Sequence, residues 1–233
     1  MSAYYTLVTS LPWLPEKMQR CRDLPISRIA LDRRLSLLAD EDKQRLQWAE
    51  ALYHRFASRI SLQPDQDWVK EWQTLCLKID SAPLHECILL RLEMQTLLAA
   101  LRYRQRDRTQ AEHFRGIGRW TQRIQQHWQE PLFGLEGAIP YLEEMGKLFQ
   151  QGLSGDLQTF MDDYLWQDLL RVERSEHFTF ETVACFVLRF GLAEQRLQSD
   201  ADAALTYFAT LSDDLMQHSG IERQLEQMFE DFS

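Results

Sequence analysis

The sequence predicts an all-α fold, an elongated bundle of about nine to ten helices, because apolar residues recur at helical spacings of three and four along most of the chain. Glycine and proline are also scarce. The 233 residues include 9 glycines and 7 prolines, whereas average usage gives roughly 16 and 12. Leu, Gln, Glu, Arg and Ala dominate the remainder, and these residues lose little side-chain freedom in a helix. Composition and periodicity therefore agree on the fold class.

The N-terminus is the exception to this helical pattern. Residues 4–12 are aromatic and β-branched and end at Pro12, so we expect a short extended segment there. Ser27 then precedes an apolar stripe and is a good N-cap for the first helix. The next helix is expected to begin at Asp40, because acidic side chains favour the positive end of the helix dipole. Its stripe consists of Leu46, Ala49, Leu52, Tyr53 and Phe56.

Proline and glycine divide the rest of the chain. Pro64-Asp65 is expected to open a helix, and after Pro83 the residues 84–108 form one predicted helix of about 37 Å at roughly 1.5 Å per residue. Residues 130–140 are the most loop-like part of the chain. We treat 1–233 as a single helical domain, or as two halves, 1–130 and 131–233, joined there. The remaining predicted helices are 119–129, 140–151, 156–172, 178–197, 201–217 and 220–231, with Ser199 or Asp200 capping the one that starts at 201.

No stretch of the sequence carries a recognisable active-site motif. Gly116-Ile117-Gly118 lacks the third glycine of a dinucleotide-binding loop, and Gly152-Leu153-Ser154-Gly155 lacks the spacing of a nucleophile elbow. Three acid–histidine pairs have a spacing of four, which suits surface ion pairs, whereas di-iron bundles need Glu-x-x-His. These pairs are Glu50/His54, Glu173/His177 and Asp214/His218. We therefore predict no catalytic residues, no cofactor and no metal.

The remaining composition bears on the protein's compartment. The four cysteines lie far apart and match no zinc spacing, and most have apolar neighbours, so we expect buried, reduced thiols of a cytosolic protein. No apolar stretch approaches the roughly 18 residues that span a bilayer. The expected location is cytoplasmic, or peripheral at the inner face of the plasma membrane, with membrane contact only through partners.

Charge is distributed unevenly along the chain. The net charge of −9 argues against a nucleic-acid partner. Between Arg102 and Arg123 lie seven arginines against two acidic residues, whereas 193–233 holds nine acidic residues and two arginines. Either these are two solvated faces, or the regions pair internally, or they dock to partner proteins. For docking, the predicted partner-binding residues are Arg102, Arg104, Arg106 and Arg108.

Several segments together resemble a bacterial family known only as a domain of unknown function, often encoded beside V-type (rotary) ATPase subunits. The resemblance covers most of the chain in order, and three positions, Ala100, Arg189 and Leu197, depart from the family's pattern. The segments that carry it are 4–12, 25–27 with Leu38 and Glu41-Asp42, 98–106, 128–135, 177–181 and 186–196. Residues 98–106 and 178–196 are also similar to a larger all-helical V-type ATPase component of the C/d type, which couples the rotor stalk to the membrane ring.

The resemblance implies a mechanical role in proton or sodium transport. We expect a non-catalytic coupling or assembly subunit of a V-type ATPase, docked between the stalk subunits and the membrane ring. Its partners would be protein subunits of that ATPase. Two alternatives stay open at this point: a free-standing helical adaptor of another complex, and a metal-dependent helical enzyme that uses His54, His177 and Glu residues.

Overall fold

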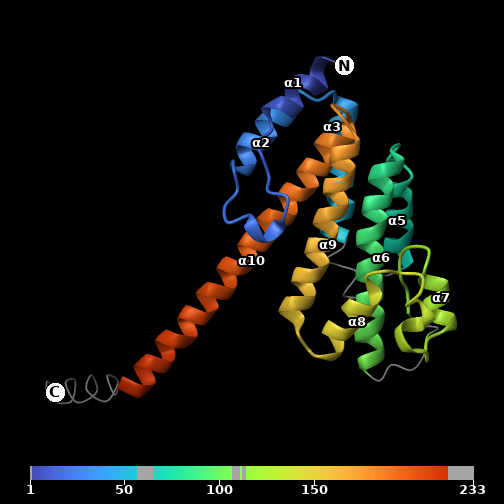
Figure 1. Cartoon of the computed structure of the whole chain (residues 1–233), viewed down its shortest axis with the longest axis vertical. Helices are drawn as coiled ribbons and strands as arrows, with labels where there is room; N and C mark the ends of the chain where they lie inside the picture. The colour runs from blue at the N-terminus through green and yellow to red at the C-terminus, as the bar shows by residue number, and fades with distance from the viewer. Residues whose placement is uncertain (1, 57–65, 107–110, 112–113, 220–233) are drawn as a thin grey trace, which may run out of the picture. The chain divides into compact units, whose positions relative to one another are not determined.

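The computed structural model describes residues 2–56, 66–106, 111 and 114–219, and within them it is all-helical, without a strand (Figure 1). This confirms the predicted all-α class. The chain divides into two compact units, Met1–Leu192 and Ala193–Ser233. The expected junction at 130/131 thus lies inside the first unit.

The prediction of an extended N-terminus was wrong, because residues 2–10 form helix α1, Ser2–Ser10. Within the helix, the Thr9 hydroxyl donates to the carbonyl oxygen of Tyr5, one turn earlier, at 2.8 Å. Leu7 is buried, 1% exposed, and α1 packs against α2. Tertiary packing of one apolar position therefore overrides the β propensity of the surrounding residues.

The next elements follow the predicted starts. Helix α2, Arg28–Leu35, begins at Ser27, whose hydroxyl accepts a hydrogen bond from the backbone N–H of Ala30 at 3.3 Å. Helix α3, Asp40–Glu50, carries three acidic residues in its first turn. It continues into a π-helical segment, η2, Ala51–Phe56. That segment was not predicted, since a π-turn leaves no distinct pattern in the sequence.

Helix α6, Ala82–Gln105, is the central element of the first unit. Its buried side chains lie on all sides of the helix, from Leu84 to Leu101, and it packs against η2 and α9 (Figure 1). A helix whose middle is buried on every side lies in the core of its unit. Helix α5, Gln66–Cys76, precedes it. The expected helix start at Pro64-Asp65 falls outside the described residues.

In Figure 1, α9 lies on one side of α6 and α7 on the other. Helix α8 packs against α9, and α9 packs against α6 and against the short helix η1 (Figure 1). The bounds of these elements are η1, Met18–Arg20; α7, Thr121–Gln126; η4, Pro131–Gly134; α8, Leu142–Gln150; and α9, Ser154–Ser175.

The two helices predicted at 178–197 and 201–217 form a single helix. Helix α10 runs without interruption over Phe180–Ser219, so the cap expected at Ser199 or Asp200 was wrong. Both side chains are exposed, and the Asp200 carboxylate lies 3.7 Å from Arg196 Nε, one turn earlier. A polar residue that points into water and pairs at i, i+4 does not end a helix. The predicted helix 220–231 lies outside the described residues.

Two further expectations concern the burial of the cysteines and the crossing of a membrane. All four cysteines are buried thiols, and burial raises the pKa of Cys76 to about 12. The neighbouring Cys185 thiol and burial raise the pKa of Cys87 as well. Among the described residues no helix combines the length and the apolar character needed to cross a bilayer.

Candidate docking surface

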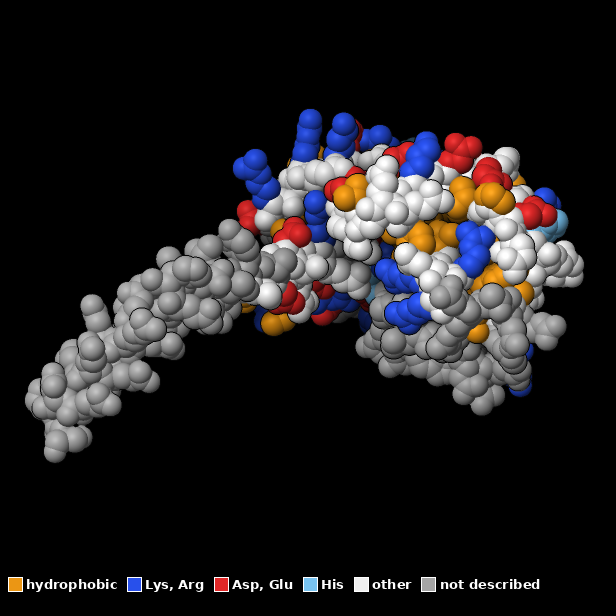
Figure 2. Space-filling model, turned by 90° about the horizontal axis from the view of Figure 1, so that it is seen from below, with side chains coloured by type: hydrophobic (Ala, Val, Ile, Leu, Met, Phe, Trp, Pro, Cys, Tyr) orange, Lys and Arg blue, Asp and Glu red, His pale blue; other side chains and the backbone are white. Residues whose placement is uncertain are grey.

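The arginine run predicted to bind partners lies at the C-terminal end of α6. Arg102 and Arg106 are exposed, Arg104 is half-buried, and Arg108 lies outside the described residues. Figure 2 shows the molecule from below, where Lys and Arg side chains border an area of hydrophobic side chains. The three described members of the run therefore do not share one environment.

Arg104 turns inward and holds a loop. Its Nη1 donates to the carbonyl oxygens of Trp128 at 3.3 Å and Glu130 at 2.8 Å. Its guanidinium lies over the Phe133 ring, 4.7 Å from the centroid. Burial lowers the pKa of this guanidinium. Arg104 thus acts within the molecule, by fixing the loop that follows α7.

The loop that Arg104 holds has an unusual backbone. Leu132, Phe133 and Gly134 have φ angles of 44°, 60° and 60°, which lie in the left-handed region. For residues with a Cβ this conformation costs roughly 1–2 kcal/mol each. Packing offsets that cost: Phe133 is 0% exposed, and Leu132 packs on Gly146 of α8. A Cβ at Gly146 would come within 2.5 Å of the Leu132 Cδ2 methyl, so a larger residue there would push the Leu132 side chain aside.

A second loop is tied to α6 by two polar side chains. Thr96 exchanges hydrogen bonds with both backbone groups of Ile117, each at 3.0 Å. Glu93, 2% exposed, accepts hydrogen bonds from Arg119 through its backbone N–H at 2.9 Å and its Nε at 3.0 Å. Burial raises the pKa of the Glu93 carboxyl, and the Arg119 contacts partly offset this rise. Gly118, at φ 99°, is needed because a Cβ would lie 2.4 Å from Glu93.

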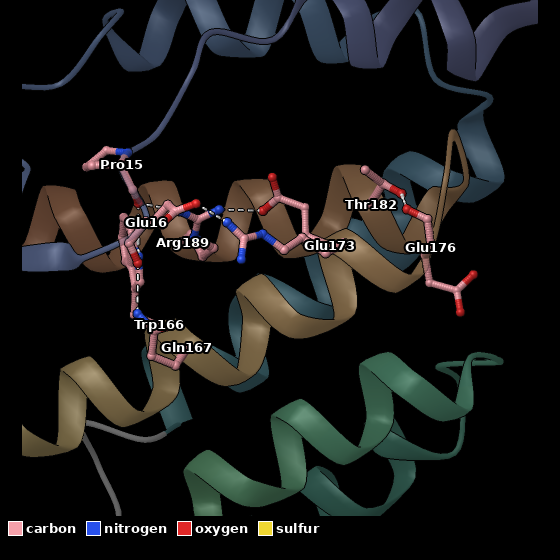
Figure 3. A network of polar contacts seen from close by, with 9 residues as sticks. Pro15, Glu16, Trp166, Gln167, Glu173, Glu176, Thr182 and Arg189 are labelled. Atoms are coloured by element: carbon pink, nitrogen blue, oxygen red, sulfur yellow. Dashed lines mark hydrogen bonds and ion pairs between the residues drawn. The ribbon is translucent and has the colours of Figure 1, made fainter.

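Arg189 of α10 is the most buried charged side chain described, at 1% exposure, and it joins three segments (Figure 3). Its Nη1 donates to the Glu173 carboxylate at 2.7 Å, and its Nη2 donates to the carbonyl oxygen of Pro15 at 2.8 Å. The guanidinium lies over the Trp166 ring, 4.3 Å from the centroid. The Trp166 indole N–H donates to the carbonyl oxygens of Pro15 and Glu16 at 3.2 and 3.1 Å.

The rest of this network extends along α9. Gln167 Nε2 donates to the Glu16 carbonyl oxygen at 2.8 Å, and the Thr182 hydroxyl donates to the Glu176 carbonyl oxygen at 2.6 Å (Figure 3). Polar contacts therefore fix the N-terminal loop at Pro15 and Glu16 to both α9 and α10. The network is a structural joint, because its donors bind backbone oxygens or Glu173 of the same chain.

In two of the acid–histidine pairs considered for metal binding, the acid pairs with an arginine. Glu50 pairs with Arg28 at 2.6 Å, and Glu173 pairs with Arg189. The side chain of His218 lies outside the described residues. Across the described parts of the chain, no three His, Cys, Asp or Glu side chains gather closely enough to hold a metal ion.

Sequence reasoning did not anticipate the joint at Arg189. Pro15 and Arg189 are 174 residues apart, so no local pattern links them. The one available signal was a charged residue at the centre of the apolar run 183–193, which interior helices tolerate only when the charge is paired. The same signal marks Glu93 within α6.

Comparison with known proteins gave no match. No family model, no curated protein and no solved structure resembles the chain at a significant level. The likeness to the neighbours of V-type ATPase subunits stays a prediction from the sequence.

Proposed function

We propose that this chain is a non-catalytic docking protein that serves as a coupling or assembly subunit of a V-type rotary ATPase. It would lie between the soluble stalk subunits and the membrane ring and contact the membrane only through them. The partner is named by the sequence resemblance. Support for docking comes from the exposed cationic end of α6.

The observation that carries the proposal is the contrast within the arginine run. Arg102 and Arg106 are four residues apart, so they lie on one helix face, and both are exposed. Arg104 between them is instead bound to backbone oxygens of the same chain. Two exposed guanidinium groups at fixed spacing suit the carboxylates of an acidic partner surface.

The rest of the first unit provides a stiff support for this surface. The middle of helix α6 is buried, and Arg104 and Glu93 fix the two adjoining loops to it. A rigid body of this kind can transmit torque or keep neighbouring subunits in register. Charge at its surface sets the orientation and rate of docking more than the final affinity.

The test is co-purification of ATPase subunits with the full-length protein from native membranes. The variant is Arg102→Glu/Arg106→Glu, which leaves Arg104 in place and so preserves the loop. The matched control is Arg20→Glu/Arg22→Glu, which reverses two other exposed arginines and changes net charge equally. We expect the first variant to recover markedly less ATPase than wild type, and the control to recover as much.

Three results would contradict the proposal. Equal recovery with the Arg102/Arg106 variant would show that this surface does not dock. Equal loss with both variants would show only a dependence on overall charge. Recovery of a different complex without ATPase subunits would favour the free-standing adaptor instead.

A further inference from the structure

One face of α9 forms a groove that the proposed function does not use. The groove has a volume of about 380 Å³. Its lining residues are spaced by three or four along the helix, so they form a single stripe. They are Phe160, Asp163, Tyr164, Gln167, Asp168 and Arg171. Eleven positions separate the first from the last, which is about 16 Å along a helix.

The walls of this groove combine two chemistries. Phe160 and Tyr164 contribute aromatic rings, whose centroids are 6.4 Å apart, and Tyr164 rests edge-on against Tyr141 at 5.0 Å. The acidic groups are Asp163 and Asp168, against the single cation Arg171 among the lining residues. Two carboxylates and one guanidinium leave a formal charge of −1 beside the aromatic rings. Such a surface attracts a cation that can also stack.

The groove already binds a guanidinium. Arg171 Nη2 lies 2.8 Å from the Asp168 carboxylate, whose side chain is only 16% exposed, while Arg171 itself is 68% exposed. Asp168 raises the pKa of that guanidinium. An ionised carboxylate has about four acceptor sites, so Asp168 can bind a second guanidinium beside Arg171.

We propose that the α9 groove binds an arginine side chain presented by a partner protein. The incoming guanidinium would bind Asp168 beside Arg171, stack on Tyr164 or Phe160, and reach Asp163 at the other side of the stripe. Asp163 already accepts a hydrogen bond from Gln19, and an ionised carboxylate has room for about four such bonds. Arginine fits better than lysine, since its planar group both stacks and binds a carboxylate with two N–H groups.

This proposal does not depend on the identity of the partner. The α9 groove carries the opposite charge to the docking surface on α6. The Arg102/Arg106 surface would attract acidic groups, whereas the α9 groove would attract a basic one. A partner that engaged both would be held in one orientation, because its charges would match in a single arrangement.

The experiment measures binding of short peptides to the full-length protein by calorimetry and by NMR shift changes. The probe is an acetylated, amidated Ala-Arg-Ala-Ala-Arg-Ala peptide. Its matched peptide carries citrulline in place of both arginines, which keeps the shape and removes the charge. We expect the arginine peptide to bind about tenfold more tightly than the citrulline peptide, the size of one charge-assisted contact.

Variants of α9 locate the effect. Asp163→Asn and Asp168→Asn should each weaken binding of the arginine peptide about tenfold. Asp162→Asn, on the same helix but outside the groove, is the control and should bind as wild type does. Circular dichroism and the unfolding midpoint of each variant separate loss of structure from loss of binding.

The proposal would be overturned by any of three results. Equal binding of the two peptides would show that charge is not recognised. Equal affinity of wild type, Asp163→Asn and Asp168→Asn would place the peptide elsewhere. Equal weakening by Asp162→Asn would show a general attraction to an acidic protein. These outcomes leave the α6 proposal untouched, because its test uses different residues and a different readout.

Discussion

Two arginines, Arg189 and Arg104, perform the same task in different surroundings. Arg189 donates to one backbone carbonyl oxygen of a loop and Arg104 to two, and each lies over an aromatic ring, Trp166 and Phe133 respectively. Arg189 is almost fully buried and has a carboxylate partner, Glu173. Arg104 is half-buried and binds carbonyl oxygens alone among the described residues.

The difference shows how burial and counter-charge go together. A buried guanidinium loses its hydration, and a carboxylate such as Glu173 offsets that loss better than neutral carbonyl oxygens do. At the surface, water solvates the remaining N–H groups, so carbonyl oxygens are sufficient. Arg189 is therefore an internal joint, while Arg104 is a support that can stand beside an exposed docking surface.

The largest expected effect follows from removing Arg189. Arg189→Ala should lower the free energy of unfolding by about 3–5 kcal/mol, because it breaks a buried ion pair and releases the N-terminal loop. The unfolding free energy of Arg189→Lys should lie between those of Arg189→Ala and wild type, because lysine keeps the charge but lacks the two-sided donor geometry of the guanidinium. Urea unfolding at pH 7 measures both. A change under about 0.5 kcal/mol, as for an ordinary surface substitution, would contradict the role of the joint.

Arg104→Ala should have a smaller effect, a loss of about 1–2 kcal/mol, because two hydrogen bonds to a partly exposed group are removed without leaving a buried charge. The left-handed turn should also loosen, which faster hydrogen exchange of the amides from Leu132 to Leu135 would report. Arg102→Ala provides the comparison, since this neighbour is exposed and should change stability by under about 0.5 kcal/mol. Equal losses of stability in Arg104→Ala and Arg102→Ala would contradict the different roles of these two arginines.

The smallest expected effect on stability concerns a third arginine, Arg119. Here the test changes its carboxylate partner, Glu93, instead of the arginine. Arg119 is 53% exposed, yet it binds the buried carboxylate of Glu93. Since the pKa of Glu93 is raised in the folded chain, the unfolded chain loses this proton first as pH rises. Stability from this group is therefore fully present below its ordinary pKa of 4.5 and falls as pH rises through the folded pKa.

Glu93→Gln isolates that contribution. The difference in unfolding free energy, wild type minus Glu93→Gln, should decrease as pH rises from 4.5 and then level off. Denaturant unfolding at a series of pH values measures it. A difference that increases with pH would mean that Arg119 outweighs burial and lowers the pKa of Glu93.

Local patterns were enough to predict most of the helices. Ser27 caps α2 as expected, and four members of the α3 stripe, Leu46, Ala49, Leu52 and Tyr53, are buried. Failures came where tertiary context decides: Leu7 draws an aromatic and β-branched segment into helix α1, and the polar residues at 199–200 stay helical because they face water. Propensity is a weak guide where one buried side chain outweighs it.

The candidate surface was predicted less completely than the fold. The sequence located the arginine run, but spacing alone could not tell that Arg104 faces Phe133 while Arg102 and Arg106 face solvent. Inward or outward direction depends on which loop returns to the helix, and residues 128–133 do so from more than twenty positions away. The groove on α9 was not predicted for a similar reason, since its stripe mixes aromatic, acidic and basic residues without a familiar motif.

The π-helical segment Ala51–Phe56 has a consequence for how the chain tolerates length changes. A π-turn accommodates one residue more than an α-turn, so it shifts everything before it by about 100° around the helix axis. Deleting one residue here would restore an ordinary helix and rotate Leu46 and Ala49 away from the side on which Tyr53 is buried. Inserting one residue elsewhere in α3 would rotate the residues before it in the opposite direction. Removing one residue from this segment should therefore be harder to accommodate than a point substitution.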